Sequence, residues 1–254
     1  MENRENIIGI TKVRNESKII EDTLRHYIQF CYKIIIYDDD STDDTVSKIN
    51  KFREGKSSTG LDSSDIIVIR WDRWSPENRD KLESKHRQIA FDESKKYHSD
   101  FTLIFDADER IHEFPKYEDY KDKDSVRMRF FDAYITPMDV LCRYDERDWF
   151  GIECRDILNL IRTKKIIWFN YNDARIPLVD DPMRHFTWWF VKHYWKAISI
   201  KEWEDACDYY MKWWKYKDKW QERKWKAIHY YSDFKTPLIP WDKLIQEPKI
   251  WRFV

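Results

Sequence analysis

The chain has 254 residues, with 46 Lys plus Arg against 47 Asp plus Glu and a formal net charge of −1. This length suits one large α/β domain, or a domain with an appended subdomain, and allows a sizeable core. The balanced charge excludes a global attraction to nucleic acid, so any basic site must be local. Only 4 glycines are present, which argues against a glycine-rich phosphate-binding loop.

The cysteines and the N-terminal segment indicate the compartment. The four cysteines are widely separated and form no CxxC pair, so we expect reduced core thiols. The opening segment MENRENIIGITKV is charged before a short apolar run, unlike a secretory signal, and no window approaches the roughly eighteen apolar residues of a membrane span. We therefore expect a cytoplasmic protein without a membrane span. The host cytoplasm is expected if the low glycine and high Lys, Ile and Tyr content reflects a viral origin.

Strand and helix signals alternate through the first half of the chain. The predicted strands are IIGITKV (7–13), KIIIYD (33–38), IIVIRW (66–71) and FTLIFDADER (101–110). Apolar spacing predicts helices over 16–32, from about 43 to 52, and over 76–96. Repeated strand and helix units with short apolar strands predict a doubly wound, mostly parallel sheet flanked by helices.

The second half has a different character. VRMRFF (126–131) and KIIWF (165–169) predict strands, and Trp, Tyr and Lys at helical spacing predict helices over about 201–226. No linker or repeat separates the halves. We expect one compact unit in which residues 1–124 bind a common ligand and residues 125–254, aromatic-rich and more helical, shape an acceptor pocket. A membrane-facing Lys/Trp surface is the alternative interpretation of the aromatic segment.

The second strand ends in an acidic cluster, IIIYDDDSTDDT (34–45). Asp40, Ser41 or Thr42 could cap the following helix, which would explain one or two acids. Adjacent carboxylates repel and raise each other's pKa unless a cation or hydrogen-bond donors compensate. Because ligands of open α/β sheets bind at the carboxyl ends of strands, a capped turn and a ligand site both remain open here.

A second acidic strand end, LIFDADER, places Asp106 and Asp108 two positions apart. In an extended segment both side chains project to the same side. Paired carboxylates suit Mn²⁺ or Mg²⁺, which prefer oxygen ligands. The alternative interpretation of this segment is a strand that ends in a turn with solvated acidic side chains.

Four segments together resemble the nucleotide-binding half of GT-A glycosyltransferases, in particular glycosyltransferase family 2 and its relatives. They are VRNES after the first strand, YDDDSTDDT against the family's DDxSxDxT pattern, KHRQIAF in the third helix, and IFDADERI at the DxD segment. Their order and spacing agree over residues 7–110. Asp40 and Asp44 stand where the family often has glycine, which puts the turn geometry in question.

The resemblance implies roles for individual residues. Asp38 and Asp39 would contact the nucleoside, with one of them accepting a hydrogen bond from the base. Lys85 and Arg87 would lie toward the diphosphate, and Asp108 would be the principal metal ligand. The remaining implied donor-site residues are Thr11, Val13 and Arg14 along the pocket, Glu16 at its edge, and Asp106 at the ribose or the metal.

The resemblance also places a catalytic base downstream of the DxD segment, within FFDAYITPMDVLCRYDERDWFGIECRD. Asp145 or Asp148, each beside an aromatic residue, are the first candidates, and Asp132 follows them. Related enzymes often add a histidine to the metal shell. His185 in RHFTWWF fits that element best, with His193 and His229 as alternatives.

The sequence therefore favours a metal-dependent glycosyltransferase that uses a nucleotide-diphosphate sugar, by default a UDP-sugar, and inverts the anomeric centre. The acceptor would be a glycan, a glycoprotein or another hydroxyl compound, and the cofactor Mn²⁺ or Mg²⁺. A sugar nucleotidyltransferase is the first alternative, although TKVRNESK lacks the glycine-rich basic loop expected there. A non-catalytic carbohydrate-binding protein is the second, although both acidic clusters are present.

Overall fold

A computed structural model describes residues 7–55, 65–70, 79–169, 176–180, 185–212, 217–230, 233 and 236–253, without the side chains of 79–81 and 185–188. The chain forms two compact units. The first comprises Met1–Glu109, Glu113–Met128 and Ile157–Trp189, and the second comprises Arg110–His112, Arg129–Asp156 and Phe190–Val254. The functional division expected at residue 124 stays a prediction.

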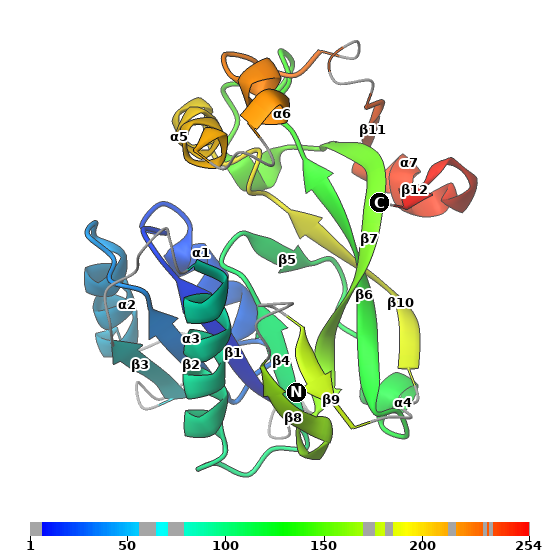
Figure 1. The fold of residues 1–254 in the computed structure, drawn as a ribbon. Coiled ribbons are helices and arrows are strands. Elements are labelled where there is room, and N and C mark those ends of the chain that lie inside the picture. Colours follow the sequence, from blue (N-terminus) through cyan, green and yellow to red (C-terminus); the bar gives the residue numbers. More distant parts are fainter. Residues whose placement is uncertain are drawn as a thin grey trace. The chain divides into compact units, whose positions relative to one another are not determined.

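The first unit is built on four parallel strands in the order β3-β2-β1-β4 (Figure 1). They are β1 (Ile7–Val13), β2 (Lys33–Asp38), β3 (Ile66–Arg70) and β4 (Phe101–Phe105). The end of β7 (Trp149–Arg162) pairs antiparallel with β4. Because β1, β2 and β4 are parallel neighbours, their carboxyl ends and the acids that follow them lie at one edge of the sheet.

Helices cover both faces of this sheet. The helices are α1 (Ile20–Tyr27), α2 (Thr45–Glu54) and α3 (Arg79–Ser94). Ile8 and Ile10 of β1 pack in one core with Phe91 of α3. Gly9 points to the opposite face, because alternate side chains of a strand do so. A Cβ at Gly9 would lie 2.9 Å from Phe105 Cε1 and 3.1 Å from the Sγ atom of the cysteine that follows α1, so this close approach requires glycine.

The predicted strands of the first half are confirmed, except that the fourth is shorter than expected and that Trp71, in the third, lies outside the described residues. The helix expected over 16–32 is shorter, because residues 14–19 form a loop that is hydrogen-bonded to the loop after β2. The strand expected over 101–110 ends at Phe105. There the Glu109 N–H donates to Asp106 O at 3.3 Å and closes a turn, after which β5 (Glu109–Ile111) begins.

Two small elements complete the first unit. Helix α4 (Tyr117–Tyr120) buries Tyr120 against Phe101 of β4. Strands β8 (Ile166–Phe169) and β9 (Pro177–Val179) form a separate antiparallel pair.

The second unit combines strands with the aromatic helices. Strands β6 (Ser125–Ala133), β7 and β10 (His185–His193) contribute residues to both units, and β11 (Leu238–Pro240) and β12 (Arg252–Phe253) pair with β7. Its helices are α5 (Ile200–Met211), α6 (Lys217–Arg223) and α7 (Trp241–Gln246). Trp203 of α5 and Trp220 of α6 are buried in one core with Tyr134. Among the described helices, none has the length and apolarity that a membrane crossing needs.

The helices expected over about 201–226 are present as α5 and α6, but the sequence did not predict β7 and β10. The described residues between 125 and 193 are therefore more β-rich than expected. Charged residues interrupt the apolar pattern of β7, and the structure pairs them with charges on β6. Asp156 accepts two hydrogen bonds from Arg129, at 2.7 and 2.8 Å, and Arg155 Nη1 lies 3.3 Å from Asp132 Oδ1. Such cross-strand pairs stabilise a sheet without an apolar signature in the sequence.

Candidate functional site

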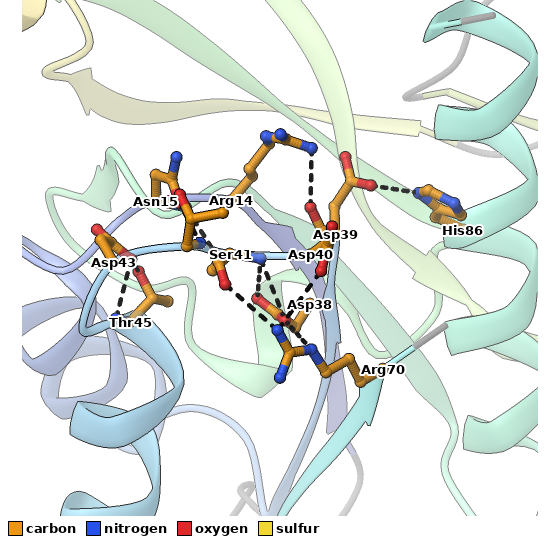
Figure 2. Close-up of polar contacts among 11 residues, drawn as sticks. Arg14, Asn15, Asp38, Asp39, Asp40, Ser41, Asp43, Thr45, Arg70 and His86 are labelled. Atoms are coloured by element: carbon orange, nitrogen blue, oxygen red, sulfur yellow. Dashed lines mark hydrogen bonds and ion pairs between the residues drawn. The ribbon is translucent and has the colours of Figure 1, made fainter. Parts of the chain in front are cut away.

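The loops that follow β1 and β2 hold each other in place at the carboxyl edge of the first unit (Figure 2). Asn15 and Asp40 both have φ of 55°. The Asn15 N–H donates to Ser41 Oγ at 3.0 Å, and the Thr42 N–H donates to Asn15 Oδ1 at 2.8 Å. Asn and Asp tolerate this left-handed conformation better than other non-glycine residues, because their short polar side chains can hydrogen-bond locally. Asp40 therefore adopts a backbone conformation typical of glycine.

The start of α2 is held by Asp43 rather than by the capping residues expected from the sequence. Asp43 Oδ1 accepts a hydrogen bond from the Thr45 N–H at 3.0 Å, and Oδ2 accepts one from the Ser17 N–H at 3.1 Å. Partial burial acts to raise the pKa of Asp43, but the hydrogen bonds from Thr45 and Ser17 lower it below its ordinary value. The Glu16 N–H donates to Thr45 Oγ1 at 2.7 Å, so Glu16 fixes the edge of this loop through its main chain.

Asp38 is fully buried at the end of β2, and its carboxylate stabilises the turn. Its two oxygens lie 3.3 and 3.4 Å from the Ser41 N–H nitrogen. Arg70, at the end of β3, places Nε 3.3 Å from Asp38 Oδ2 and Nη2 3.5 Å from Asp40 Oδ1. The polar capacity of Asp38 is thus largely used within the fold.

Asp39 is equally buried but differently surrounded. Its N–H donates to Val13 O at 2.9 Å, and Arg14 Nη1 donates to its carbonyl oxygen at 3.1 Å. Lys12 Nζ lies 3.1 Å from Oδ2. His86 Nδ1 lies 3.5 Å from Oδ1 (Figure 2). Within the described part of the chain, neither carboxylate oxygen of Asp39 accepts a hydrogen bond of good geometry. Asp39 therefore keeps acceptor capacity that Asp38 lacks.

The end of β4 is linked to α3 through Arg87. The buried Arg87 donates from Nη2 to Asp106 Oδ1 at 2.6 Å, and the same nitrogen lies 3.4 Å from Glu83 Oε1. Glu109 Oε2 accepts a hydrogen bond from the Asp106 N–H at 3.1 Å. Asp108 lies half-buried in the turn between these residues. Besides Glu109, the turn thus presents the carboxylates of Asp106 and Asp108, the first of which is already held by a guanidinium group.

The structure brings together some of the predicted donor-site residues. Asp38, Asp39 and Arg14 are neighbours, and Arg87 contacts Asp106. Lys85 is exposed on α3, and since residues two apart on a helix face different directions, it does not share the position of Arg87. Three basic residues around the acids were not predicted: Lys12 in β1, Arg70 at the end of β3, and His86. His86 stands next to Arg87 within KHRQIAF, so that motif could have indicated it.

In the second unit, Asp132 is the centre of a charged network. Lys196 Nζ lies 2.6 Å from Oδ2, and His193 Nδ1 lies 2.6 Å from Oδ1. Arg155 Nη1 lies 3.3 Å from Oδ1, and Lys196 also donates to Tyr134 Oη at 2.8 Å. Burial acts to raise the pKa of Asp132, but Lys196, His193 and Arg155 bring it well below the ordinary value.

The other two base candidates also lie in the second unit. Asp145 belongs to a short 3₁₀ turn (Tyr144–Glu146) and forms an ion pair with Arg143. Asp148 is exposed, and the Trp241 N–H donates to its carbonyl oxygen at 3.0 Å.

The histidine candidates differ in what the structure describes. The side chain of His185 lies outside the described residues. Of its alternatives, His193 contacts Asp132, and His229 is buried, which lowers the pKa of its imidazole.

No protein-family model matches the chain, and no curated protein sequence is similar to it. Among solved structures, the fold is similar to mannosyltransferase PcManGT from Pyrobaculum calidifontis in complex with GDP-Man and Mn²⁺, at 13% identity and a TM-score of 0.47, over 82% of this chain and 64% of that one. HddC from Yersinia pseudotuberculosis matches at 9% identity and a TM-score of 0.38, over 80% and 98% of the two chains. Glucosyl-3-phosphoglycerate synthase from Mycobacterium tuberculosis, in complex with phosphoglyceric acid, matches at 13% identity and a TM-score of 0.32, over 64% and 58%.

This chain spans slightly less than two thirds of the length of the mannosyltransferase that it matches. The α/β fold expected from the sequence is confirmed by the strands themselves, since β1 to β4 form a parallel sheet with helices on both faces. Likeness at such low identity concerns the fold alone. A fold of this kind hosts many activities, so the function must come from the site.

Proposed function

We propose that this protein is a metal-dependent glycosyltransferase that moves a sugar from a nucleotide-diphosphate donor, by default a UDP-sugar, to an acceptor hydroxyl with inversion. The observation that best supports this proposal is the environment of the Asp39 carboxylate. This carboxylate is fully buried at the carboxyl end of a parallel strand, and its oxygens accept no well-formed hydrogen bond from the described residues.

Lys12 forms an ion pair with Asp39 Oδ2, but a buried carboxylate oxygen that accepts no well-formed hydrogen bond has lost its hydration without full compensation. An ionised carboxylate only accepts hydrogen bonds, so the complementary ligand group is an N–H or O–H donor. The N–H edge of a nucleobase is such a donor. Asp38 already accepts from the Ser41 N–H and pairs with Arg70, so we assign base recognition to Asp39 and a turn-holding role to Asp38.

The turn after β4 fits the divalent cation that the fold class implies. Asp106 and Asp108 provide carboxylate oxygens, which are the donors that Mn²⁺ and Mg²⁺ take in proteins. The cation bound there would supply Lewis-acid stabilisation of the departing diphosphate. Arg87 holds Asp106 through the 2.6 Å contact, which fixes the orientation of that carboxylate, and its guanidinium charge favours phosphate nearby.

The environment of the acids narrows the choice of catalytic base. A general base works best when its pKa lies near the operating pH. The contacts with Lys196 and Arg155 keep the pKa of Asp132 well below the ordinary value, so its carboxylate is a weak base. Asp145 and Asp148 remain the candidates for removing the proton from the acceptor hydroxyl during a single displacement. Asp132 instead holds the charged network of the second unit.

The first test is thermal unfolding of the full chain with UDP, GDP, ADP, CDP and dTDP, each with and without Mn²⁺. A ligand at about one hundred times its Kd stabilises the native state by about 2.7 kcal/mol, which raises Tm by several degrees in a chain of this size. We expect one nucleotide to raise Tm, and to do so more strongly with Mn²⁺. A nucleotide shift that is indifferent to Mn²⁺ would contradict the metal role, and no shift with any nucleotide would contradict the donor site.

Product analysis separates the two enzyme classes. With the nucleotide so identified, the corresponding nucleotide-sugar and a hydroxyl acceptor should release the nucleoside diphosphate. Release of pyrophosphate from a nucleoside triphosphate and a sugar phosphate would instead identify a sugar nucleotidyltransferase. The matched inactive controls are Asp108→Asn for the metal and Asp145→Asn and Asp148→Asn for the base.

A further inference from the structure

Trp225 is unfavourably placed in two respects. Its φ is 65°, in the left-handed region that favours glycine because a Cβ crowds the following carbonyl oxygen. Its side chain is also 81% exposed, so most of the indole gains nothing from burial. A bulky residue in this backbone conformation is a genuine outlier, and such outliers concentrate at functional sites.

The contacts that hold this conformation involve the main chain of Trp225. Residue 225 follows the end of α6, where the Lys224 N–H donates to Trp220 O at 3.0 Å. The Trp225 N–H points at Glu204 of α5, whose two carboxylate oxygens lie 3.0 and 3.1 Å away. Any residue except proline supplies this N–H, and glycine or asparagine would supply it with less strain. The fold therefore requires the backbone conformation but not the indole.

The surroundings of the indole indicate which ligand it suits. Lys224 Nζ lies 5.1 Å from the centre of the Trp225 ring and forms an ion pair with Asp208. Glu204 adds a carboxylate that retains further acceptor capacity. One cationic donor thus lies near the exposed indole ring, and one carboxylate lies at the main chain of the same residue. Two of the acids of α5 are already paired with lysines, Asp208 with Lys224 and Asp205 with Lys201, so the test includes an anionic lipid surface as a separate outcome.

A sugar ring matches this arrangement, because it combines an apolar face with a rim of hydroxyl groups. An aromatic side chain supplies large rigid apolar area at little conformational cost. We propose that Trp225 is a sugar-stacking residue that binds one ring of a neutral glycan, with Lys224 and Glu204 hydrogen-bonding to its hydroxyl groups. That this glycan is the acceptor rests on the proposed function, but the binding itself depends only on residues of the second unit.

The experiment uses the full chain and the variants Trp225→Asn and Trp225→Gly, with Trp168→Asn as the matched control. Trp168 is a 45% exposed tryptophan on β8 of the first unit. Binding of maltotetraose, cellotetraose, mannotetraose and chitotetraose is measured by calorimetry and saturation-transfer NMR, and Tm by thermal unfolding. We expect both Trp225 variants to weaken binding of the preferred sugar at least tenfold. Their Tm should be unchanged or raised by up to about 4 °C, because the backbone strain is relieved.

Each other outcome overturns the proposal. A lower Tm in both variants would show that the indole is structural, and unchanged sugar binding would show that it is not a ligand contact. If the native chain binds none of the four sugars, a neutral glycan is excluded as the ligand of Trp225. Binding to phosphatidylglycerol vesicles that Trp225→Asn abolishes, without sugar binding, would assign a membrane surface instead. If sugar binding requires Trp225 but no nucleotide raises Tm, the glycosyltransferase function is contradicted. The assignment of Trp225 as a sugar-binding residue would still stand.

Discussion

Two aspartates, one in each unit, differ in how firmly their carboxylates are held. Asp132 near the end of β6 is held by Lys196 and His193 at 2.6 Å each, and by Arg155 at 3.3 Å. Asp39 after β2 has Lys12 at 3.1 Å and His86 at 3.5 Å, and its oxygens accept no well-formed hydrogen bond from the described residues. Both are acids at strand ends in the sequence, so position alone does not distinguish them.

The difference separates a structural acid from a binding acid. A carboxylate whose oxygens are all engaged by fixed cations stabilises its surroundings but has nothing to offer a ligand. A buried carboxylate with remaining acceptor capacity gains most from a donor that arrives with a ligand. Substitutions of the two residues should therefore affect different quantities: the free energy of unfolding for Asp132, and nucleotide affinity for Asp39.

The largest effect is expected for Asp132→Ala. Removing this carboxylate leaves the buried Lys196 ammonium without its partner, which should destabilise the fold by about 3–5 kcal/mol. Urea unfolding measures the loss, and Lys196→Met in the same chain should restore part of it. The matched control is Asp205→Ala, which breaks the exposed pair with Lys201 and should change stability far less. A small loss of stability in Asp132→Ala would contradict the assignment of Asp132 as a structural acid and of Asp39 as a binding acid.

The second prediction concerns Asp39→Asn. This change keeps the shape but removes the charge-assisted acceptor, which is worth about 1.5–3 kcal/mol or a 10- to 150-fold weaker nucleotide affinity. Nucleotide titration measures the affinity, and the same titration of Asp132→Asn is the control, because we expect its affinity to stay within about threefold of the native value. Nucleotide binding that survives Asp39→Asn unchanged would contradict the assignment of base recognition to Asp39.

The third prediction is the acid dependence of stability. The pKa of Asp132 in the folded state lies well below its ordinary value, and in the unfolded chain it is about 3.9. The stability that the ionised Asp132 carboxylate contributes is therefore fully present above about pH 4. It is lost as the pH falls through the pKa of Asp132 in the folded state. Each pKa unit of difference corresponds to about 1.4 kcal/mol. Unfolding of native protein and Asp132→Asn between pH 7 and pH 2.5 should converge at low pH, and parallel curves would contradict the charged network.

The sequence predicts secondary structure well where the hydrophobic pattern lies within a single strand or helix. Strand β1 has the predicted bounds, and it begins with the apolar run IIGI, which is characteristic of a strand covered on both faces. The acids Asp38 and Asp39 emerge at the end of β2 for the same reason. The roles of these two acids could not be predicted, because they depend on Lys12, Arg70 and His86, whose positions around the acids are set by tertiary contacts.

The second unit was harder to predict for a related reason. The charges of β7 are compensated by charges on β6, so Asp156 in the sequence resembles a surface residue although it pairs with Arg129. The left-handed backbone at Trp225 was also hidden, since no glycine or asparagine marks it. Backbone conformation at such positions is set by main-chain contacts such as those with Glu204, which composition does not reveal.

The smallest effect is expected for Asp40→Gly, which asks whether the acid next to Asp39 takes part in binding. Asp40 has φ of 55°, and its exposed carboxylate lies 3.5 Å from Arg70 Nη2. Glycine relieves the backbone strain but adds entropy to the unfolded chain, so stability should change by less than about 1 kcal/mol and nucleotide affinity should persist. Asp40→Val, which cannot adopt this conformation easily, should lose about 1–2 kcal/mol. If Asp40→Gly instead abolishes nucleotide binding at unchanged stability, the binding acid is shared between Asp39 and Asp40.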